Sequence, residues 1–353
     1  MQGRARLPGL TISSPRHRSL YSSPSLNKSR SRRIFSDTFR SHLNSPTTPL
    51  QHRLFRASAS KMTTPPPTEL LFHHNSTLTT HPTTLLTITP FALLPEPDQS
   101  LFKSSPPLEK QNAFVLTFPS TIFHPQGGGQ PSDEGTITSS SSSSGVSFTV
   151  TSVRHSLTSP SQVLHLGTFP SPDAVFRPGD EVTQAIDVKK RLYYSRLHTA
   201  GHILGSAVRH LLESHIEGFD ELKASHFPDS AACEFRGLIE GKWKGPIQDK
   251  VNEFLQAKMP VEIDWWDQQD FAREGLERLI LPRDGEGENV IKPEGGRGKK
   301  WRVVRIVGAE VYPCGGTHVE RTDLCGEEVK VRKIGRSKGC SRVSYGVVPG
   351  LEG

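Results

Sequence analysis

The chain has 353 residues, enough for two medium-sized domains and a tail, and its hydrophobic content of 33% is low for a folded protein. No run of 18 or more apolar residues occurs, so a membrane-spanning helix is not expected. The four cysteines, at positions 233, 314, 325 and 340, lack the spacing of a disulfide framework. A reducing compartment is therefore the simpler expectation.

The formal charge of +7 is unevenly distributed. Residues 1–61 hold 12 Lys and Arg against one acid, which leaves 31 basic and 35 acidic side chains in the rest, a net charge of −4. The high pI of about 9.3 therefore reflects the N-terminal segment and does not indicate nucleic-acid binding by the folded part. One local excess remains, since residues 292–342 hold 13 Lys and Arg against six acids.

The N-terminal segment, residues 1–61, is rich in Arg and Ser and lacks the apolar core of a secretory signal. This composition is typical of a mitochondrial transit peptide, and the alternatives are a disordered basic leader or an extension that is rarely translated. Met62 could serve as a second start. We therefore expect a cytoplasmic protein with a second, mitochondrial form that uses residues 1–61.

A β-rich domain is predicted over residues 66–186. Short strand-like runs separated by Pro, Gly, Ser and Asn clusters indicate hairpins and a small barrel. The runs are Leu70–Phe72, Thr84–Ile88, Ala113–Phe118, Val146–Val153, Gln162–Leu166 and Val182–Ile186. Serines 139–144 are interpreted as a flexible hairpin loop, because they offer nothing to pack.

Three consecutive glycines, Gly127, Gly128 and Gly129, precede Gln130 within this region. Such a backbone reaches positive φ and lets a ligand approach closely, at an entropic cost that a plain loop need not bear. Gln130 and Asp133 would add an amide and a carboxylate beside it. On glycine content alone, a simple turn or bulge is the favoured alternative.

The second domain is predicted over residues 187–353. Asp187 is suited to cap a helix at Lys189–Ser214, and the grouping of later elements indicates an α+β fold with helices packed on an antiparallel sheet. The later helices are predicted at Ile247–Met259 and Gln268–Leu279, and the strands at Ala231–Phe235, Val261–Trp265, Trp301–Val307, Glu327–Ile334 and Ser341–Val348. Residues 284–298, rich in Gly, Glu and Lys, are interpreted as an exposed loop.

Two motifs supply a potential metal site. His198 and His202, at i and i+4, project from one side of the predicted helix, beside its apolar stripe rather than within it. Cys314 and His318 flank a tight Gly-Gly turn. Three imidazoles and one thiolate suit the tetrahedral N and S coordination of Zn²⁺, so we expect one ion per chain.

These motifs occur together in a known order. From Leu70 to Val348 the chain resembles the AlaX-type alanyl-tRNA editing proteins, the free-standing relatives of the alanyl-tRNA synthetase editing domain. The matching pieces are the glycine-rich segment 127–135, Ile186-Asp187 before Lys189-Lys190-Arg191, His198 to Leu204, Cys314 to Val319, and Lys338-Gly339 followed by Arg342 to Tyr345.

The resemblance favours the alanyl branch, because the related threonyl domain typically has Arg-Gly-Pro between its Cys and His. We expect a medium-length, free-standing protein, since 353 residues leave no room for an adenylation domain before the editing region. One departure from the family is Gly201, a position that is often larger and whose small size would widen the pocket.

The resemblance implies that the protein hydrolyses, in trans, the ester bond of Ser-tRNA(Ala), and that Gly-tRNA(Ala) is its second substrate. A synthetase pocket built for alanine cannot strongly exclude a ligand that adds only a hydroxyl, so a second site must remove the error. The resemblance assigns His198, His202, Cys314 and His318 as zinc ligands. Beside these ligands we assign the backbone of Gly127, Gly128 and Gly129 with Gln130 to the amino-acid pocket. Thr199 and Thr317, each adjacent to a ligand, are weaker candidates for sensing the serine hydroxyl, and Lys338 and Arg342 are assigned to acceptor-stem phosphates.

The chemistry at the ion stays open at this point. Four protein ligands normally form a closed structural site, whereas catalytic zinc keeps one position for water. If the ion is reactive, it would polarise the ester carbonyl and lower the pKa of a bound water toward about 7, and no separate catalytic side chain is assigned.

The expected partner is mischarged alanine tRNA, without a membrane and with the monomer favoured. The competing hypothesis is a zinc-stabilised RNA-binding module without hydrolytic activity. For Lys338 and Arg342, a solvated strand face is the alternative to phosphate contacts.

Overall fold

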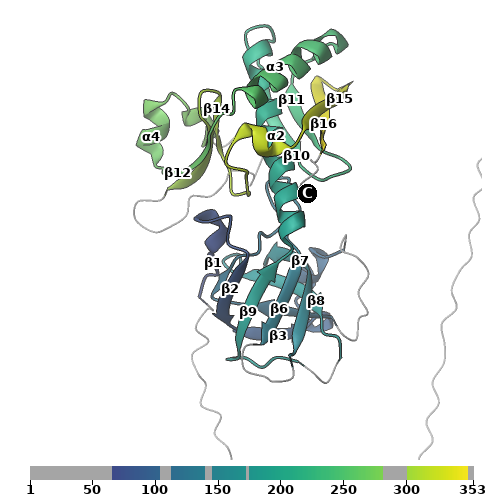
Figure 1. Ribbon diagram of the computed structural model, residues 1–353, viewed down its shortest axis with the longest axis vertical. Coiled ribbons are helices and arrows are strands. Elements are labelled where there is room, and N and C mark those ends of the chain that lie inside the picture. The colour runs from purple at the N-terminus through teal and green to yellow at the C-terminus, as the bar shows by residue number, and fades with distance from the viewer. Residues whose placement is uncertain (1–65, 104–112, 140–144, 172–174, 281–299, 349–353) are drawn as a thin grey trace, which may run out of the picture. The chain divides into compact units, whose positions relative to one another are not determined.

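Strand pairing dominates the fold, and nearly all of it is antiparallel. The computed structural model describes residues 66–103, 113–139, 145–171, 175–280 and 300–348 (Figure 1). Within them the fold is mixed α and β, as the sequence predicts, and the one parallel pair is β1 (Glu69–Leu70) with β5 (Ser120–Thr121). The predicted leader, the serine run after Ser139 and the loop at 284–298 lie outside the described residues.

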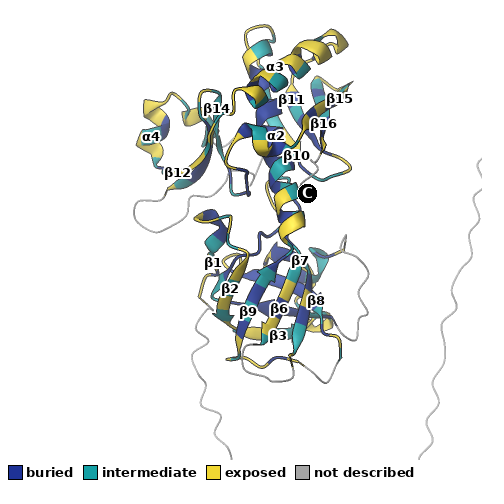
Figure 2. Cartoon of the chain, in the orientation of Figure 1, coloured by how far each residue is buried: buried dark blue, intermediate teal, exposed yellow. Residues whose placement is uncertain are grey.

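A seven-stranded antiparallel sheet forms the N-terminal part and curls around a core of phenylalanines and aliphatic side chains (Figures 1 and 2). In spatial order its strands are β2 (Thr80–Thr84), β9 (Glu181–Ile186), β6 (Gly135–Ser139), β7 (Ser147–His155), β8 (Val163–Thr168), β4 (Ala113–Thr117) and β3 (Thr87–Pro90). The edge strands β2 and β3 form no pair with each other in the described ranges, so closure into a barrel stays a prediction.

Two predicted strands of this part are wrong. Residues 70–72 belong mainly to a 3₁₀ helix, η1 (Leu71–His73), and the run 84–88 is split between β2 and β3. The split has a physical cause, because the Leu85 N–H donates to the Asp180 carbonyl while the Leu86 N–H donates to the Thr117 carbonyl. The chain thus changes sheet partner between adjacent residues, which an apolar pattern does not reveal.

A short helical segment in the same part was not predicted. It consists of η2 (Phe91–Leu93) and α1 (Glu96–Ser100), which together are too short to show helical periodicity. The buried Asp98 of α1 accepts hydrogen bonds from the Ser156 and Thr158 hydroxyls, so a polar contact fixes this segment to the sheet.

Helix α2 (Val188–Leu212) begins as the sequence predicts, with the Asp187 side chain accepting a 3.0 Å hydrogen bond from the Lys190 N–H. It packs on a four-stranded antiparallel sheet beside α3 (Lys244–Gln256), and together they bury the largest apolar cluster of the described residues. The strands, in spatial order, are β10 (Asp220–Ser225), β11 (Ala232–Arg236), β16 (Cys340–Val348) and β15 (Glu328–Ser337). Of these, β10 was not predicted.

A third sheet carries the chain to the second motif. It orders β12 (Val261–Trp266), β13 (Trp301–Ile306) and β14 (Glu310–Pro313), the last of which was not predicted and ends directly before Cys314. The predicted helix at 268–279 is too long: α4 (Gln268–Arg273) stops before Gly275, whose φ of +67° breaks the helix, and η4 (Glu277–Leu279) follows. The remaining short segments are η3 (Gly241–Trp243) and η5 (Thr322–Cys325).

The two halves described above meet within one unit. Met62–Gly353 cluster together by contacts, and hydrogen bonds from the glycine-rich segment reach α2 and the loop after β14. The predicted division at 186/187 falls between β9 and α2 and stays a prediction. Among the helices of the described ranges, none combines the length and apolar character needed to cross a membrane.

Candidate metal centre

Helix α2 brings the first two donors together. His198 and His202 lie one turn apart and are both buried, with ring centroids 4.9 Å apart. Three polar residues on the same side of the helix, Ser195, Ser206 and Arg209, are buried as well, so the two imidazoles do not lie at the protein surface. Their polar atoms must therefore be satisfied inside the fold.

The loop after β14 supplies the other two donors. Cys314 Sγ lies 3.4 Å from His198 Nε2 and 3.3 Å from His318 Nε2. One donor atom from each of the four predicted ligands lies within 4.8 Å of all the others. The edges of a tetrahedron around Zn²⁺, with ordinary Zn–S and Zn–N bonds, are about 3.5 Å, so the spacing suits this ion.

Gly316 makes this approach feasible. A Cβ added to it would lie 2.2 Å from His198 Cε1 and 2.8 Å from Gln130 Oε1, distances that no side chain could accept. The Gly316 N–H also donates to Cys314 Sγ at 3.3 Å. The glycine in this motif is thus required by close packing against the facing helix.

Burial keeps the cluster uncharged. It lowers the pKa values of His198, His202 and His318 well below the usual range, and the neighbouring imidazoles add to the effect. Burial also raises the pKa of the Cys314 thiol, against the opposing influence of Arg302 and of the Gly316 N–H. Neutral imidazoles offer the lone pairs that a metal needs, and a bound cation would favour the Cys314 thiolate.

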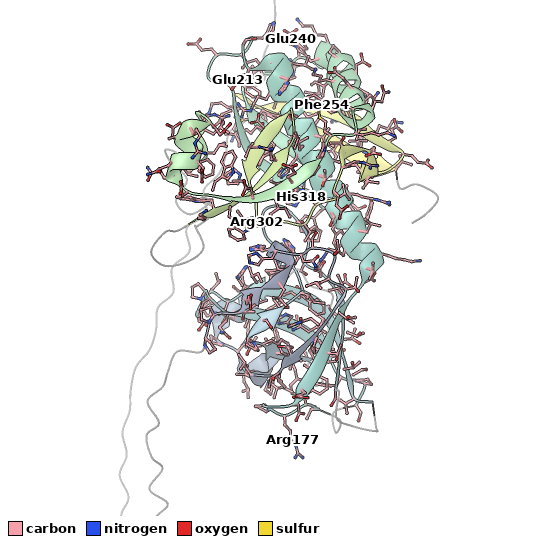
Figure 3. All side chains as sticks on the ribbon, turned by 60° about the vertical axis from the view of Figure 1, so that its left-hand side comes forward. Arg177, Glu213, Glu240, Phe254, Arg302 and His318 are labelled. Carbon is pink, nitrogen blue, oxygen red and sulfur yellow. The ribbon has the colours of Figure 1, made fainter. Side chains whose placement is uncertain are left out.

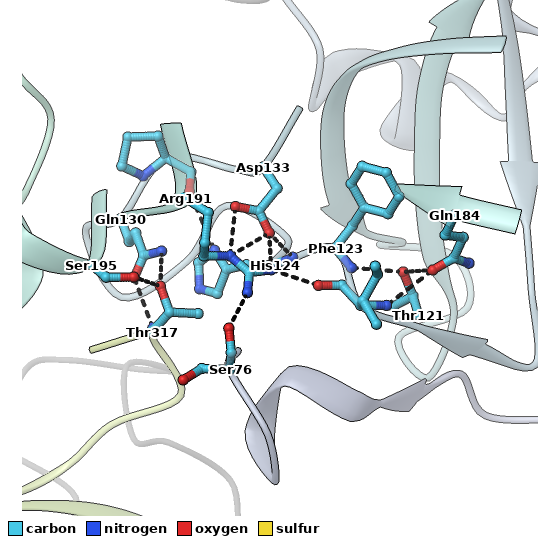
Figure 4. A network of polar contacts seen from close by, with 12 residues as sticks. Ser76, Thr121, Phe123, His124, Gln130, Asp133, Gln184, Arg191, Ser195 and Thr317 are labelled. Atoms are coloured by element: carbon cyan, nitrogen blue, oxygen red, sulfur yellow. Dashed lines mark hydrogen bonds and ion pairs between the residues drawn. The ribbon is translucent and has the colours of Figure 1, made fainter. Parts of the chain in front are cut away.

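Gln130, which Figure 4 shows beside Thr317 and Ser195, fixes the orientation of His198. Its Oε1 accepts a 3.0 Å bond from the Thr317 N–H and lies 2.7 Å from His198 Nδ1. Since this oxygen can only accept, His198 Nδ1 carries the proton and Nε2 presents its lone pair to the cluster. Gln130 Nε2 in turn donates to Thr317 Oγ1 at 2.8 Å, and the Ser195 hydroxyl lies 2.7 Å from the same oxygen. Such outer partners orient metal ligands in proteins.

The other two imidazoles differ in their support. His318 Nδ1 lies 3.1 Å from Thr199 Oγ1, which also accepts the Val319 N–H. His202 Nδ1 is buried and has no hydrogen-bond partner. An orphaned nitrogen beside three converging donor atoms fits a site that is completed by a cation.

A second layer supports the loop of Cys314. Arg302 is buried, donates from Nε to the His73 carbonyl at 3.1 Å and also donates to the Cys314 carbonyl. His73 Nε2 donates to the Gly315 carbonyl at 3.1 Å. Figure 3 labels Arg302 and His318 close to one another, in agreement with the influence of Arg302 on the pKa of His318.

Behind His202 lies a charged layer. The Tyr312 ring faces His202 with centroids 4.5 Å apart, and its hydroxyl donates to Glu221 at 3.3 Å. Arg209 pairs with both Glu221 and Glu310 at 3.2 Å. Burial raises the pKa of Glu221 to about 7 against the influence of Arg209, so the cluster is bordered by a carboxyl group that titrates near neutrality.

The glycine-rich segment is a tight turn as well as a neighbour of the cluster. The Gln130 N–H donates to the Gly127 carbonyl at 2.9 Å, and Gly128 and Gly129 have φ values of +54° and +78°. The turn interpretation is therefore confirmed, and two adjacent positive φ values explain the glycines. Asp133 is not free to meet a ligand, because Arg191 and the His124 N–H occupy it.

The predicted sensors of the serine hydroxyl have partners already. Thr199 and Thr317 are fully buried, and their hydroxyls are engaged by His318 and Gln130 respectively. Lys338 is exposed in the turn between β15 and β16, whereas the Arg342 guanidinium donates to the Ser230 carbonyl at 2.8 Å and lies 3.9 Å from the Glu234 carboxylate. Thr199 and Thr317 thus bond to His318 and Gln130, whereas Lys338 and Arg342 lie on the hairpin formed by β15 and β16.

Sequence reasoning missed several neighbours of the cluster. His226 stacks on His198, Arg191 bonds to Asp133, and Ser195 bonds to Thr317. The basic run 189–191 was a visible signal for the ion pair, because a buried acid in the glycine-rich segment needs a cation. His226 follows β10 in a stretch without any motif, so no local pattern could have singled it out.

The sequence of this chain is similar to a known domain family and to several known proteins. Residues 301–344 match the family described as threonyl and alanyl tRNA synthetase second additional domain. The chain is 28% identical to the alanyl-tRNA editing protein AlaX-L of Pyrococcus horikoshii, over 64% of this chain and 49% of that protein. It is also 30% identical to the alanine–tRNA ligase of Methanothermobacter thermautotrophicus, over 71% of this chain and 25% of the ligase.

The chain is thus similar both to an alanyl-tRNA editing protein of the AlaX type and to alanine–tRNA ligases. It spans about half of AlaX-L and about a quarter of the ligase. The segment matched by the second additional domain runs from β13 through Cys314 and His318 into β16, so the second half of the cluster lies inside that segment.

Proposed function

We propose that this AlaX-type chain hydrolyses the ester of wrongly charged alanine tRNA, with Zn²⁺ as cofactor and a seryl group as the main substrate. The observation that carries the proposal is the buried cluster of three imidazoles and one thiol in a relative of AlaX-L. Three neutral imidazoles and one thiol that can become a thiolate form a donor set that suits Zn²⁺.

In this proposal His198, His202, Cys314 and His318 hold the ion. Bound there, Zn²⁺ supplies Lewis-acid polarisation of an ester carbonyl. The unpaired His202 Nδ1 supports this assignment, and so does the contact of His198 Nδ1 with Gln130 Oε1, which leaves the lone pair of His198 on Nε2.

The remaining residues bind and orient. Gln130 holds the His198 tautomer and Thr199 holds His318, which gives both a positioning role in place of direct substrate contact. The exposed backbone of Gly127 and Gly128 is proposed to adjoin the amino-acid pocket. Lys338 remains the better candidate for a tRNA phosphate, because the Arg342 side chain is tied to its own sheet.

The direct test supplies the purified full chain, loaded with zinc, with Ser-tRNA(Ala), Gly-tRNA(Ala) and Ala-tRNA(Ala). The expected result is rapid release of serine, slower release of glycine and near-complete retention of alanine. Removal of the metal by a chelator should abolish release, and added Zn²⁺ should restore it.

A specific observation favours the competing hypothesis of a zinc-stabilised RNA-binding module. All four donors come from the protein and are buried, as in closed structural sites. Retention of all three amino acids by a fully zinc-loaded chain that still binds the tRNA would establish that hypothesis and refute ours.

A further inference from the structure

His226 lies against the cluster without belonging to it. It directly follows β10, is buried, and stacks on His198 with ring centroids 4.1 Å apart and planes inclined by 23°. Its N–H donates to the Gly129 carbonyl at 2.8 Å. This one residue therefore touches the metal-binding helix and the glycine-rich turn at once.

The hydrogen bonds of Tyr345 determine the tautomer of His226. The Tyr345 hydroxyl donates to the Leu197 carbonyl at 2.9 Å and also lies 2.7 Å from His226 Nδ1. A carbonyl has no proton to give, so the single hydroxyl proton of Tyr345 is used there. His226 Nδ1 must then be the donor to Tyr345, which leaves the lone pair on Nε2. No residue in the described part of the chain bonds to this Nε2.

Two glycines make room for the ring. A Cβ at Gly201 would lie 2.4 Å from His226 Cε1, and a Cβ at Gly129 would lie 3.2 Å from His226 Cδ2. The expectation that Gly201 widens the pocket is therefore wrong, because His226 and Tyr345 fill the space it leaves. The absence of a side chain at Gly201 thus allows the His226 imidazole to pack beside His198.

We propose that His226 determines specificity, with its Nε2 accepting a hydrogen bond from the hydroxyl of a seryl group held at the cluster. This inference rests on the proposed function, since it assigns a contact within the same site. His226 is buried like the candidates from the sequence, Thr199 and Thr317, but the hydroxyls of those two are engaged, whereas no residue in the described part of the chain bonds to His226 Nε2.

The chemistry of an unpaired acceptor supplies the discrimination. An alanyl or glycyl group has no hydroxyl and would leave Nε2 without a donor after water is displaced, which disfavours its binding. The α-ammonium group is common to all three amino acids and could not separate them. A fixed, neutral acceptor beside the ester therefore distinguishes serine by its side chain.

The kinetic test compares seryl and glycyl esters of alanine tRNA in the full chain and in a His226→Phe variant. Phenylalanine retains the stacked ring and lacks Nε2. The preference for serine over glycine should fall about tenfold to a hundredfold, while glycine release changes by less than about threefold and bound zinc stays at the wild-type level. An equal fall for both esters, or an unchanged preference, would overturn the proposal.

A binding test is independent of catalysis. Calorimetry with 3′-deoxy-3′-(serylamino)adenosine and its alanyl counterpart should show tighter binding of the seryl compound, and His226→Phe should remove the difference. Tyr345→Phe removes the hydroxyl that fixes the tautomer of His226 and should reduce the difference in binding. The double variant should behave as His226→Phe alone.

The controls separate the two proposals. His210→Phe, on the outer part of the same helix, should leave both the preference and the binding difference unchanged. A wild-type chain that releases no amino acid refutes the proposed function. A wild-type chain that releases serine, with a serine preference that survives His226→Phe and Tyr345→Phe, refutes the role of His226 alone.

Discussion

Two polar groups on helix α2 differ in how they are satisfied, although both are buried. In the first turns, the Arg191 guanidinium bonds to Asp133 with Nε at 3.0 Å, to the Ser76 carbonyl with Nη1 at 2.9 Å and to the Ile122 carbonyl with Nη2 at 2.6 Å (Figure 4). About two and three turns later, His198 and His202 belong to a cluster of uncharged side chains that could hold a metal ion.

This difference separates a structural network from a binding site. Each nitrogen of Arg191 has a partner, so its network is complete and fixes the helix to the glycine-rich turn. In the cluster, by contrast, His202 Nδ1 has no hydrogen-bond partner. A saturated network stabilises the fold by itself, whereas the cluster with its unpaired nitrogen is the place where we propose a bound ion.

The largest expected effect comes from removing a proposed ligand. Cys314→Ala should reduce bound zinc from one ion per chain to a small fraction and lower serine release by about a thousandfold or more, because several kcal/mol of barrier lowering depend on the ion. Metal analysis and deacylation rates measure both effects. Cys340→Ser changes a half-buried thiol outside the cluster and should alter neither, and full zinc in Cys314→Ala would contradict the ligand assignment.

The saturated network should respond through stability. Arg191→Met leaves the Asp133 carboxylate buried and unpaired, which should cost about 3–5 kcal/mol in the free energy of unfolding. Urea denaturation measures the loss. Lys190→Ala is the matched control on the adjacent residue, since its ion pair with Glu134 is partly exposed and should be worth at most about 1 kcal/mol. An equal loss in the free energy of unfolding for the two variants would show that the Arg191 network does not fix helix α2 to the glycine-rich turn.

Gln130 links the two regions and should have an intermediate effect. Gln130→Leu removes the partner of His198 Nδ1 and leaves the Thr317 N–H unpaired, so zinc affinity should fall about tenfold to a hundredfold. Competition with a fluorescent chelator measures the affinity. Gln126→Leu, in the same turn region and partly buried, should leave it within about twofold.

The smallest effect concerns a buried histidine that is fully paired. His165 lies 2.8 Å from Thr121 Oγ1 and 3.2 Å from the Leu116 carbonyl, and burial lowers its pKa to about 4. Its unfolded pKa is about 6.5, so the unfolded state binds the extra proton and stability falls as the pH drops from about 6.5 to 4.

A His165→Gln variant removes this dependence. Between pH 7 and pH 5.5 the wild type should lose about 1 kcal/mol more stability than the variant, as measured by urea denaturation at each pH. A difference that grows toward high pH would contradict the direction of the pKa shift.

Much of the site's position was predictable from the sequence. The cap at Asp187, the long helix, and the two donors one turn apart follow from local chemistry, and the Cys-Gly-Gly-Thr-His motif requires only a tight turn. The four donors meet because the order of elements brings β14 to the middle of α2. The strands with alternating or continuous apolar runs, such as β7 and β16, were also found near their observed bounds.

What was missed depends on long-range contacts. The partners of Gln130 lie 68 and 187 residues away along the chain, and those of His226 are on α2 and β16. Asp133 looked like a ligand-binding carboxylate, yet it pairs with Arg191, 58 residues later. No periodicity encodes such pairings. The short strands β10 and β14 were missed because polar residues interrupt their patterns.

The separation of the donors along the chain has a consequence for folding kinetics. His198 and Cys314 lie 116 residues apart, and Gln130 precedes Thr317 by 187 residues. A chain that has formed only α2 offers two imidazoles, which hold an ion weakly, and full coordination requires closure of this long loop. Such non-local contacts form slowly. Tight zinc binding during refolding should therefore coincide with the final tertiary step, so that bound zinc would indicate a fully folded chain.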